Sequence, residues 1–281
     1  MKVLILARSK SGTTALLYKL AAAQPELKTF SGGALDKAVN IDGDAVIKFT
    51  LSGQKGRSFE DFRDHLSKTE YDRKIWIARD PRDNSISRLL FSWYRGFRVN
   101  KIQYRTFINL IEKKEQNPES VPFSELMRYR SEPLEPVSIS KVIDDERRSC
   151  DQMYRFVNEL KDDWFIFKYE DLVEGNFSEL NNYLGFEVKA EDNIDKYTQK
   201  VARKKSTGDW RHWYTEEDIK LFRSVYTPYM NLIGYDSSDW VLPATQLIEP
   251  EYASLYLKSL PHRRRIDSIE KWKKKITRFL K

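Results

Sequence analysis

The first residues of the chain have the pattern of strand, tight turn and helix start that holds a phosphate group. Residues 3–7 are an apolar run with the length and composition of a buried strand. Residues 9–12 (SKSG) are small and polar, which is typical of a turn, and residues 13–23 are rich in Ala and Leu, which favours a helix. Free backbone N–H groups at a helix start stabilise an anion, and Lys10 adds a positive charge. The sequence therefore predicts an anion-binding loop here.

The order of residues in this loop distinguishes it from the loop of nucleotide kinases. In GxxxxGK[ST] the Lys follows the last Gly, whereas here Lys10 precedes Gly12 and no Gly opens the loop. KSGTT instead resembles the 5′-phosphosulfate loop of sulfotransferases, whose donor is 3′-phosphoadenosine 5′-phosphosulfate (PAPS). The continuation ALLYKLAAAQPEL resembles the glycan-modifying branch of that family. The resemblance implies that the following residues bind the donor: Ser9, Lys10, Ser11, Gly12, Thr13 and Thr14.

A second stretch, residues 74–94, supports the same resemblance. It reads as an apolar strand that ends at Arg79, a Pro-containing turn at residues 80–83, and a helix from Asn84. Arg79 and Ser87 are eight residues apart, so a strand end and the second turn of a helix can aim at one point. A guanidinium and a hydroxyl suit a phosphate dianion there. This spacing resembles the 3′-phosphate motif of the family.

Two later segments match the family as well. Residues 202–215 (ARKKSTGDWRHWYT) resemble its closing segment RKGxxGDW, with five matches: Arg203, Lys204, Gly208, Asp209 and Trp210. Lys205 replaces the first Gly, and the resemblance implies that Arg203, Lys204 and Lys205 hold donor phosphates. A solvated run of charges is the alternative. In the segment at residues 165–172, the resemblance places Tyr169 near the adenine. In all, the resemblance spans about residues 1–236.

The resemblance also implies how sulfuryl transfer is catalysed. Lys10 resembles the loop Lys that contacts the leaving oxygen, and Lys48 resembles a Lys at a strand end that meets the transferring group. A buried Lys48 paired with a carboxylate is the alternative. No metal is implied, and PAP (adenosine 3′,5′-bisphosphate) would be the nucleotide product.

The general base is left open. In relatives that act on small molecules a His follows the strand Lys by two residues, but this chain has Thr50 there. Glycan-acting relatives use an acid after the loop helix, which makes Asp36 the first choice and Asp42 the next. Three further candidates lie on the next predicted helix: Glu60, Asp61 and His65.

Strands alternate with helices along the chain. Strands are predicted at residues 3–7, 45–50, 74–79 and 164–168, with a weaker one at 27–30. Helices are predicted at 13–23, 58–67, 84–97, 140–160, 176–184 and 216–232. This pattern predicts a single α/β domain with a central parallel sheet flanked by helices, similar to P-loop NTPases, which binds ligands at the carboxyl ends of its strands.

The predicted sulfotransferase domain covers residues 1–240. Within it, residues 98–139 carry four prolines and fit the alternation poorly, so they are predicted to be an insertion on the acceptor side or a structural helical flap. Residues 241–281 are predicted to be a carboxyl-terminal extension.

Composition and charge indicate where the protein works. The chain has 281 residues, no apolar run long enough to span a membrane, and one cysteine, Cys150, which favours a reducing, cytoplasmic location without disulfides. The first apolar run carries the loop motif and is not a signal peptide. The whole net charge of +7 lies in residues 262–281, which hold nine Lys or Arg and two Asp or Glu.

This tail reads as a basic amphipathic helix with Trp272 on its apolar face. It suits peripheral binding to an anionic membrane surface, and docking onto the protein's own core is the alternative. No motif that reads nucleic-acid bases accompanies it, so a nucleic acid is not expected as a partner.

Together these features predict an enzyme that moves a sulfuryl group from PAPS to a hydroxyl of a glycan or glycolipid. A nucleotide-dependent kinase of related fold is one alternative, which the order of Lys10 and Gly12 opposes. A non-catalytic protein that binds a nucleotide or a membrane surface is the other. The sequence predicts no oligomeric state.

Overall fold

The computed structural model describes residues 1–32, 35, 41, 43–51, 58–130, 135–160, 162, 164–189 and 207–262. The chain divides into two compact units. The first unit comprises Met1–Asn84, Arg148–Asp195 and Tyr226–Ser237. The second unit comprises Ser85–Arg147, Lys196–Val225 and Ser238–Lys281.

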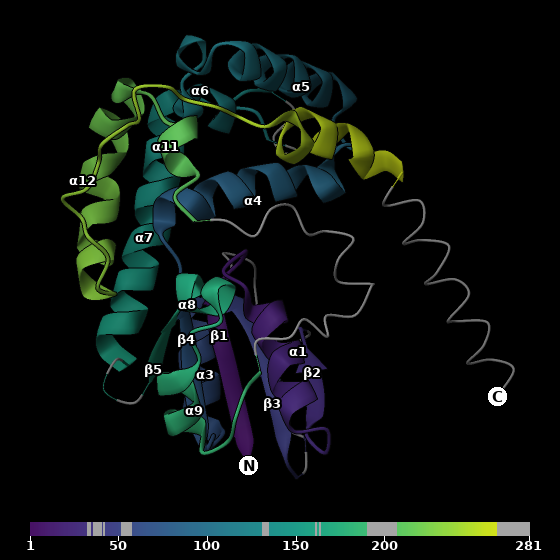
Figure 1. Cartoon of the computed structure of the whole chain (residues 1–281), viewed down its shortest axis with the longest axis vertical. Coiled ribbons are helices and arrows are strands. Elements are labelled where there is room, and N and C mark those ends of the chain that lie inside the picture. Colours follow the sequence, from purple (N-terminus) through teal and green to yellow (C-terminus); the bar gives the residue numbers. More distant parts are fainter. Residues whose placement is uncertain are drawn as a thin grey trace, which may run out of the picture. The chain divides into compact units, whose positions relative to one another are not determined.

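The first unit is built on a five-stranded sheet in the order β2-β3-β1-β4-β5, in which every pairing is parallel (Figure 1). The strands are β1 (Lys2–Arg8), β2 (Lys28–Ser31), β3 (Ala45–Leu51), β4 (Arg73–Ala78) and β5 (Phe165–Lys168). The structure confirms all the predicted strands, the weaker one included, with ends that differ by one residue. It also confirms the α/β class and the parallel sheet flanked by helices.

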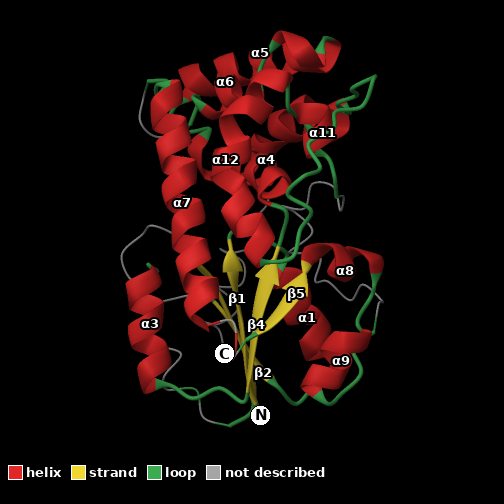
Figure 2. Cartoon of the chain, turned by 90° about the vertical axis from the view of Figure 1, so that its left-hand side faces the viewer, coloured by secondary structure: helices red, strands yellow, loops and turns green. Residues whose placement is uncertain are grey.

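Helices cover both faces of the sheet. Figure 2 shows α3 (Phe59–Lys68) on one side and α1 (Thr13–Ala23) with α9 (Ser178–Leu184) on the other. On the α1 face, Val3 and Ile5 belong to the same buried cluster as Leu16 of α1. On the α3 face, the rings of Phe49 and Phe62 meet edge to face at 5.4 Å. A strand that is covered on both faces has no polar side, which is why residues 3–7 form an unbroken apolar run.

The helix boundaries follow from their caps. α3 begins at a capping box, in which the Asp61 amide donates to Ser58 Oγ (3.1 Å) and the Ser58 amide donates to Asp61 Oδ2 (2.8 Å). α4 (Pro81–Gly96) begins three residues earlier than predicted, so the expected turn at residues 80–83 is wrong. Asp80 accepts a hydrogen bond from the Arg82 amide (2.9 Å), and Pro81 occupies the first helical position.

The second unit is helical. It holds α5 (Lys101–Gln116), the 3₁₀ turn η1 (Pro118–Ser120), α6 (Phe123–Met127) and α11 (Trp210–Trp213). Three further helices belong in part to each unit: α4, α7 (Ile139–Leu160) and α12 (Glu216–Leu232). Within the region predicted as an insertion, residues 101–116, 118–120 and 123–127 are thus helical.

Aromatic rings fill the core of the second unit. Trp93 packs against Phe107 with ring centroids 5.4 Å apart, and Phe123 stacks on Tyr214 at 5.0 Å. Residues 241–262, which the sequence assigns to an extension, also pack here, because six of them are buried: Ile248, Ala253, Ser254, Tyr256, Leu257 and Leu260.

A buried cation and a buried anion organise the loop between α5 and α6. Lys114 has no exposed surface, and its ammonium donates to the carbonyls of Pro118 and Val121, both at 2.6 Å. Asp218 of α12 is also fully buried and accepts from three backbone amides: Phe123 (2.7 Å), Ser124 (2.8 Å) and Thr215 (2.9 Å). Burial lowers the pKa of Lys114 to about 8, although the charge of Asp218 opposes this shift.

This lowered pKa predicts that alkaline conditions stabilise the fold. Between about pH 8 and pH 10.5 the folded state has released the Lys114 proton while the unfolded state still holds it. The free energy of unfolding should then rise with pH, by up to about 1.4 kcal/mol per unit. Urea unfolding of wild type and Lys114→Met from pH 7 to pH 10 isolates this effect as the difference between the two proteins. A difference that does not change with pH contradicts the prediction.

Candidate functional site

The loop at residues 9–12 joins the carboxyl end of β1 to α1. The chain turns there through two residues in the left-handed region, Lys10 (φ 71°) and Gly12 (φ 88°). The first hydrogen bond of α1 runs from the Leu16 amide to the Gly12 carbonyl (3.1 Å), so the amides of residues 13–15 precede the helical ladder. The predicted turn and helix start are confirmed, and they form the arrangement that attracts an anion.

Only glycine fits at position 12. A Cβ atom there would lie 2.8 Å from Leu172 Cδ2 and 2.9 Å from Tyr169 Cδ2. Both belong to α8 (Tyr169–Glu174), which follows β5 directly. Gly12 therefore serves two needs, a positive φ and the close approach of α8 to the loop.

Arg79 holds the loop from the next strand of the sheet. It follows β4, and its Nη1 donates to the Lys10 carbonyl at 2.7 Å. Its guanidinium also lies 4.1 Å from the ring centroid of Tyr169, within the range of a cation–π contact. The side chain is 6% exposed and its Nε makes no hydrogen bond to the described residues. Arg79 thus joins the loop, the end of β4 and the start of α8.

Asn84 makes a second link, which the sequence analysis missed. It lies in the first turn of α4, and its Nδ2 donates to the Ser9 carbonyl (3.0 Å) and to Ser11 Oγ (3.2 Å). The carbonyls of two successive loop residues are therefore tied to the β4–α4 connection. Only the polarity of Asn84 could have signalled this role, because the sequence does not show which residues approach the loop.

Lys48 was predicted to lie at the end of its strand. It reaches the site from within β3 instead. It pairs in register with Ile5, three residues before β3 ends. Its ammonium donates to Thr14 Oγ1 at 2.9 Å, which brings it to the first turn of α1. The structure thus brings Lys48, Thr14, the loop, Arg79 and Tyr169 together within the first unit.

The acidic side chains next to Arg79 are all engaged. Asp80 forms a buried ion pair with Arg82 (Oδ2 to Nη2, 2.6 Å). Glu170 of α8 accepts a hydrogen bond from the Tyr235 hydroxyl. Burial raises the pKa of Glu170, and this hydrogen bond opposes the shift. Their carboxylates are therefore engaged by partners rather than directed at an anion in the loop.

The other predicted residues divide into two groups. Ser87 lies on α4, is buried and belongs to the second unit, so its pairing with Arg79 stays a prediction. Asp36, Asp42 and residues 203–205, which are Arg203, Lys204 and Lys205, lie outside the described residues.

Two of the alternative bases have structural roles. Asp61 closes the capping box of α3. His65 is buried and hydrogen-bonds through Nε2 to the Tyr71 hydroxyl at 2.6 Å, and burial lowers its pKa. Glu60 is exposed on α3.

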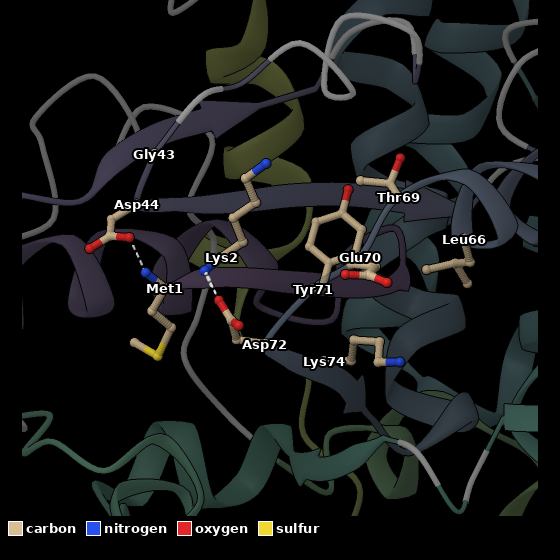
Figure 3. A pocket seen from close by; sticks show the side chains of 10 residues that line it. All are labelled: Met1, Lys2, Gly43, Asp44, Leu66, Thr69, Glu70, Tyr71, Asp72 and Lys74. Carbon is tan, nitrogen blue, oxygen red and sulfur yellow. Dashed lines mark hydrogen bonds and ion pairs between the residues drawn. The ribbon is translucent and has the colours of Figure 1, made fainter.

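A pocket of about 590 Å³ lies at the opposite, amino-terminal edge of the sheet (Figure 3). Its lining carries charges of both signs, including Lys2, Lys74 and Glu70. The Lys2 amide donates to Asp72 Oδ2 at 2.6 Å, and the terminal ammonium contacts Asp44.

The loop at residues 9–12 lies at the carboxyl-terminal edge of the sheet, which is where parallel sheets bind ligands. We therefore take this loop, and not the pocket, as the candidate functional site. Within the described residues no group of His, Cys, Asp and Glu side chains could hold a metal.

Comparison with known proteins identifies the fold. No family model matches the chain, and no curated protein matches it. Among solved structures, it is similar to mouse sulfotransferase SULT7A1 complexed with PAP, at 15% sequence identity and a TM-score of 0.50. The match covers 85% of this chain and 89% of the mouse chain. The chain therefore has the fold of a sulfotransferase.

The geometry of the loop predicts an unusual cost for Gly12→Ala. A matched control is Gly185→Ala, because Gly185 has a similar φ of 79° but open space around its Cβ position. The control should lose about 1–2 kcal/mol of stability through backbone strain alone. Gly12→Ala should lose about 1–3 kcal/mol more, because α8 must move. Urea unfolding measures both, and equal losses would show that α8 does not press on the loop.

Proposed function

We propose that the protein is a sulfotransferase that uses PAPS as donor. The observation that carries this proposal is the hydrogen bond from Arg79 to the Lys10 carbonyl (2.7 Å). It joins the loop expected to bind the 5′-phosphosulfate to the residue expected to bind the 3′-phosphate. The fold, shared with a sulfotransferase that was solved with PAP, supports the same assignment.

The donor would bind across the first unit along these contacts. Loop amides and the Thr13 and Thr14 hydroxyls would bind the 5′-phosphosulfate at the start of α1. Arg79 would bind the 3′-phosphate together with Ser87, and the Tyr169 ring, which already stacks on Arg79, would lie near the adenine. Arg203, Lys204 and Lys205 would close over the phosphates.

In the proposed reaction an acceptor hydroxyl oxygen attacks the sulfur in line. A new oxygen–sulfur bond forms, the bond between sulfur and the phosphate oxygen breaks, and PAP leaves with the electron pair. Lys10 and Lys48 would neutralise the charge that builds on the bridging oxygen and on the sulfuryl group. Asp36 would take the hydroxyl proton. The acceptor is proposed to be a glycan or glycolipid, from the likeness of the segment after the loop to glycan-acting relatives.

The kinase alternative is less well supported, because Lys10 precedes Gly12 and is held in a left-handed conformation by the Arg79 contact. A non-catalytic nucleotide-binding protein would keep this loop but show no turnover. The basic residues 262–281 support a peripheral location on the cytoplasmic face of a membrane. None of the helices in the described part of the chain has the length and apolar character of a membrane span.

Lys10→Ala tests the proposed function. The variant should keep the fold, because Lys10 lies in the loop and does not belong to the buried core. Sulfuryl transfer should fall by about 10²–10³, the usual effect of removing one group that stabilises developing charge. Transfer from labelled PAPS to a panel of glycan acceptors measures this, with thermal unfolding as the check on folding. Activity within fivefold of wild type would show that the loop Lys is not catalytic, and wild-type protein without transfer to any acceptor would favour the non-catalytic alternative.

A pair of variants tests the proposed base. Asp36→Asn should lower kcat by about 10²–10⁴ while leaving the affinity for PAP unchanged, because a base acts on the acceptor and not on the donor. Glu60→Gln is the matched control, because Glu60 is one of the alternative candidate bases and the change also replaces a carboxylate with an amide. If Glu60→Gln is impaired and Asp36→Asn is not, Glu60 is the base.

A further inference from the structure

The turn after α4 and the start of α5 expose apolar and cationic side chains that are close together in the sequence. We call five of these residues the α4–α5 corner: Arg98, Val99, Lys101, Ile102 and Arg105. All five are exposed. Ile102 is 81% exposed, the most of any large apolar side chain in the described part of the chain, and Val99 is 56% exposed. Exposed apolar side chains among cations are the combination by which segments bind an anionic interface.

The core of the second unit does not require this exposure. Asn100 caps α5 by accepting a hydrogen bond from the Gln103 amide at 3.1 Å. The inward face of α5 is then filled by Tyr104, Phe107 and Ile111, which are all buried. Ile102 does not lie on this inward face, so its apolar side chain remains in water instead of packing in the core of the second unit.

The sequence around the corner carries charge of one sign. Residues 95–111 include four Arg or Lys and no Asp or Glu: Arg95, Arg98, Lys101 and Arg105. The nearest acid along α5 is Glu112, whose carboxylate contacts Lys258. The corner is therefore complementary to an anionic partner.

The last described helix of the second unit runs toward the same end of α5. Residues 254–262 form a helix that runs antiparallel to α5, since Ser254 bonds to Glu115 (2.7 Å) and Lys258 contacts Glu112. Figure 1 shows this helix in yellow. Its direction carries the chain from the end of α5 toward its start, where the corner lies. The residues that follow, 263–281, hold nine of the chain's cations.

We propose that the α4–α5 corner is a contact site for an anionic lipid bilayer. Val99 and Ile102 enter the interface between headgroups and acyl chains, and the three cations bind the headgroup phosphates. A soluble polyanion would engage the cations but offers no apolar phase for Ile102, so the pairing of the two kinds of side chain favours a membrane. This inference does not depend on the proposed sulfotransferase activity.

A fluorophore at the corner tests this directly in the full chain. The single native cysteine, Cys150, is 2% exposed, so Ile102→Cys can be labelled selectively with an environment-sensitive dye. Val241→Cys is the matched control, because Val241 is also in the second unit and is 71% exposed. Equimolar phosphatidylserine–phosphatidylcholine vesicles should shift the emission of the dye at position 102 to the blue and leave that at position 241 unchanged. No shift at position 102, or equal shifts at both, would overturn the proposal.

Binding measurements complete the test. Replacing both apolar residues, Val99→Ser with Ile102→Ser, should weaken vesicle partitioning by about tenfold without changing the melting temperature, since both side chains are exposed. Binding to dextran sulfate, a soluble polyanion, should be unaffected by the same change. Unaltered vesicle partitioning, with dextran sulfate bound as tightly as vesicles, would show that the corner recognises charge alone and would overturn the membrane assignment.

Discussion

The hydrogen bond from Arg79 to the carbonyl of Lys10 is the constraint on which the candidate site depends. A loop that turns through two left-handed residues is strained at Lys10, where a side chain other than Gly is unfavourable. A bond of 2.7 Å from a buried guanidinium stabilises this conformation and fixes where the neighbouring amides lie. Asn84 fixes the carbonyl before it, so that the loop is held from one side by β4 and α4. The other side is closed by Tyr169 and Leu172 of α8, which leave no room for a side chain at Gly12.

This arrangement gives Arg79 two tasks in the proposed function. It would meet the 3′-phosphate with its remaining donors while it keeps the 5′ loop in shape. A nucleotide that carries both phosphates would therefore bind to a site whose halves share one side chain. The neighbouring acids have partners of their own, because Asp80 pairs with Arg82 and Glu170 accepts a hydrogen bond from Tyr235.

The sequence was sufficient for the sheet and for much of the loop. Strands buried on both faces are continuous apolar runs, and a motif in which Lys10 precedes Gly12 has few structural solutions. The start of α4 was mispredicted because Asp80 and Pro81 have the composition of a turn, yet serve as cap and first residue of a helix. α5 was not predicted as a separate helix, because the prolines that follow it made residues 98–139 fit the alternation poorly; a helical flap was the alternative there.

Contacts made at a distance along the chain could not be predicted. Nothing local indicates that Asn84 meets Ser9, or that α8 excludes a side chain at Gly12. Lys48 was assigned to a strand end by analogy, whereas its long side chain reaches Thr14 from the middle of β3. Asp36, the proposed base, lies outside the described residues, so its assignment comes from the resemblance alone.

Calorimetric titration of the protein with PAP, AMP and ATP is the most direct test of whether the site recognises a nucleotide with a 3′-phosphate. PAP and AMP differ only in the 3′-phosphate, and each charge-assisted hydrogen bond to it should contribute about 1.5–3 kcal/mol. We expect PAP to bind at least about tenfold more tightly than AMP and ATP, and Ser87→Ala to reduce this preference without lowering the affinity for AMP. Equal affinity for PAP and AMP would contradict this expectation, because Arg79 would then have no 3′-phosphate to bind.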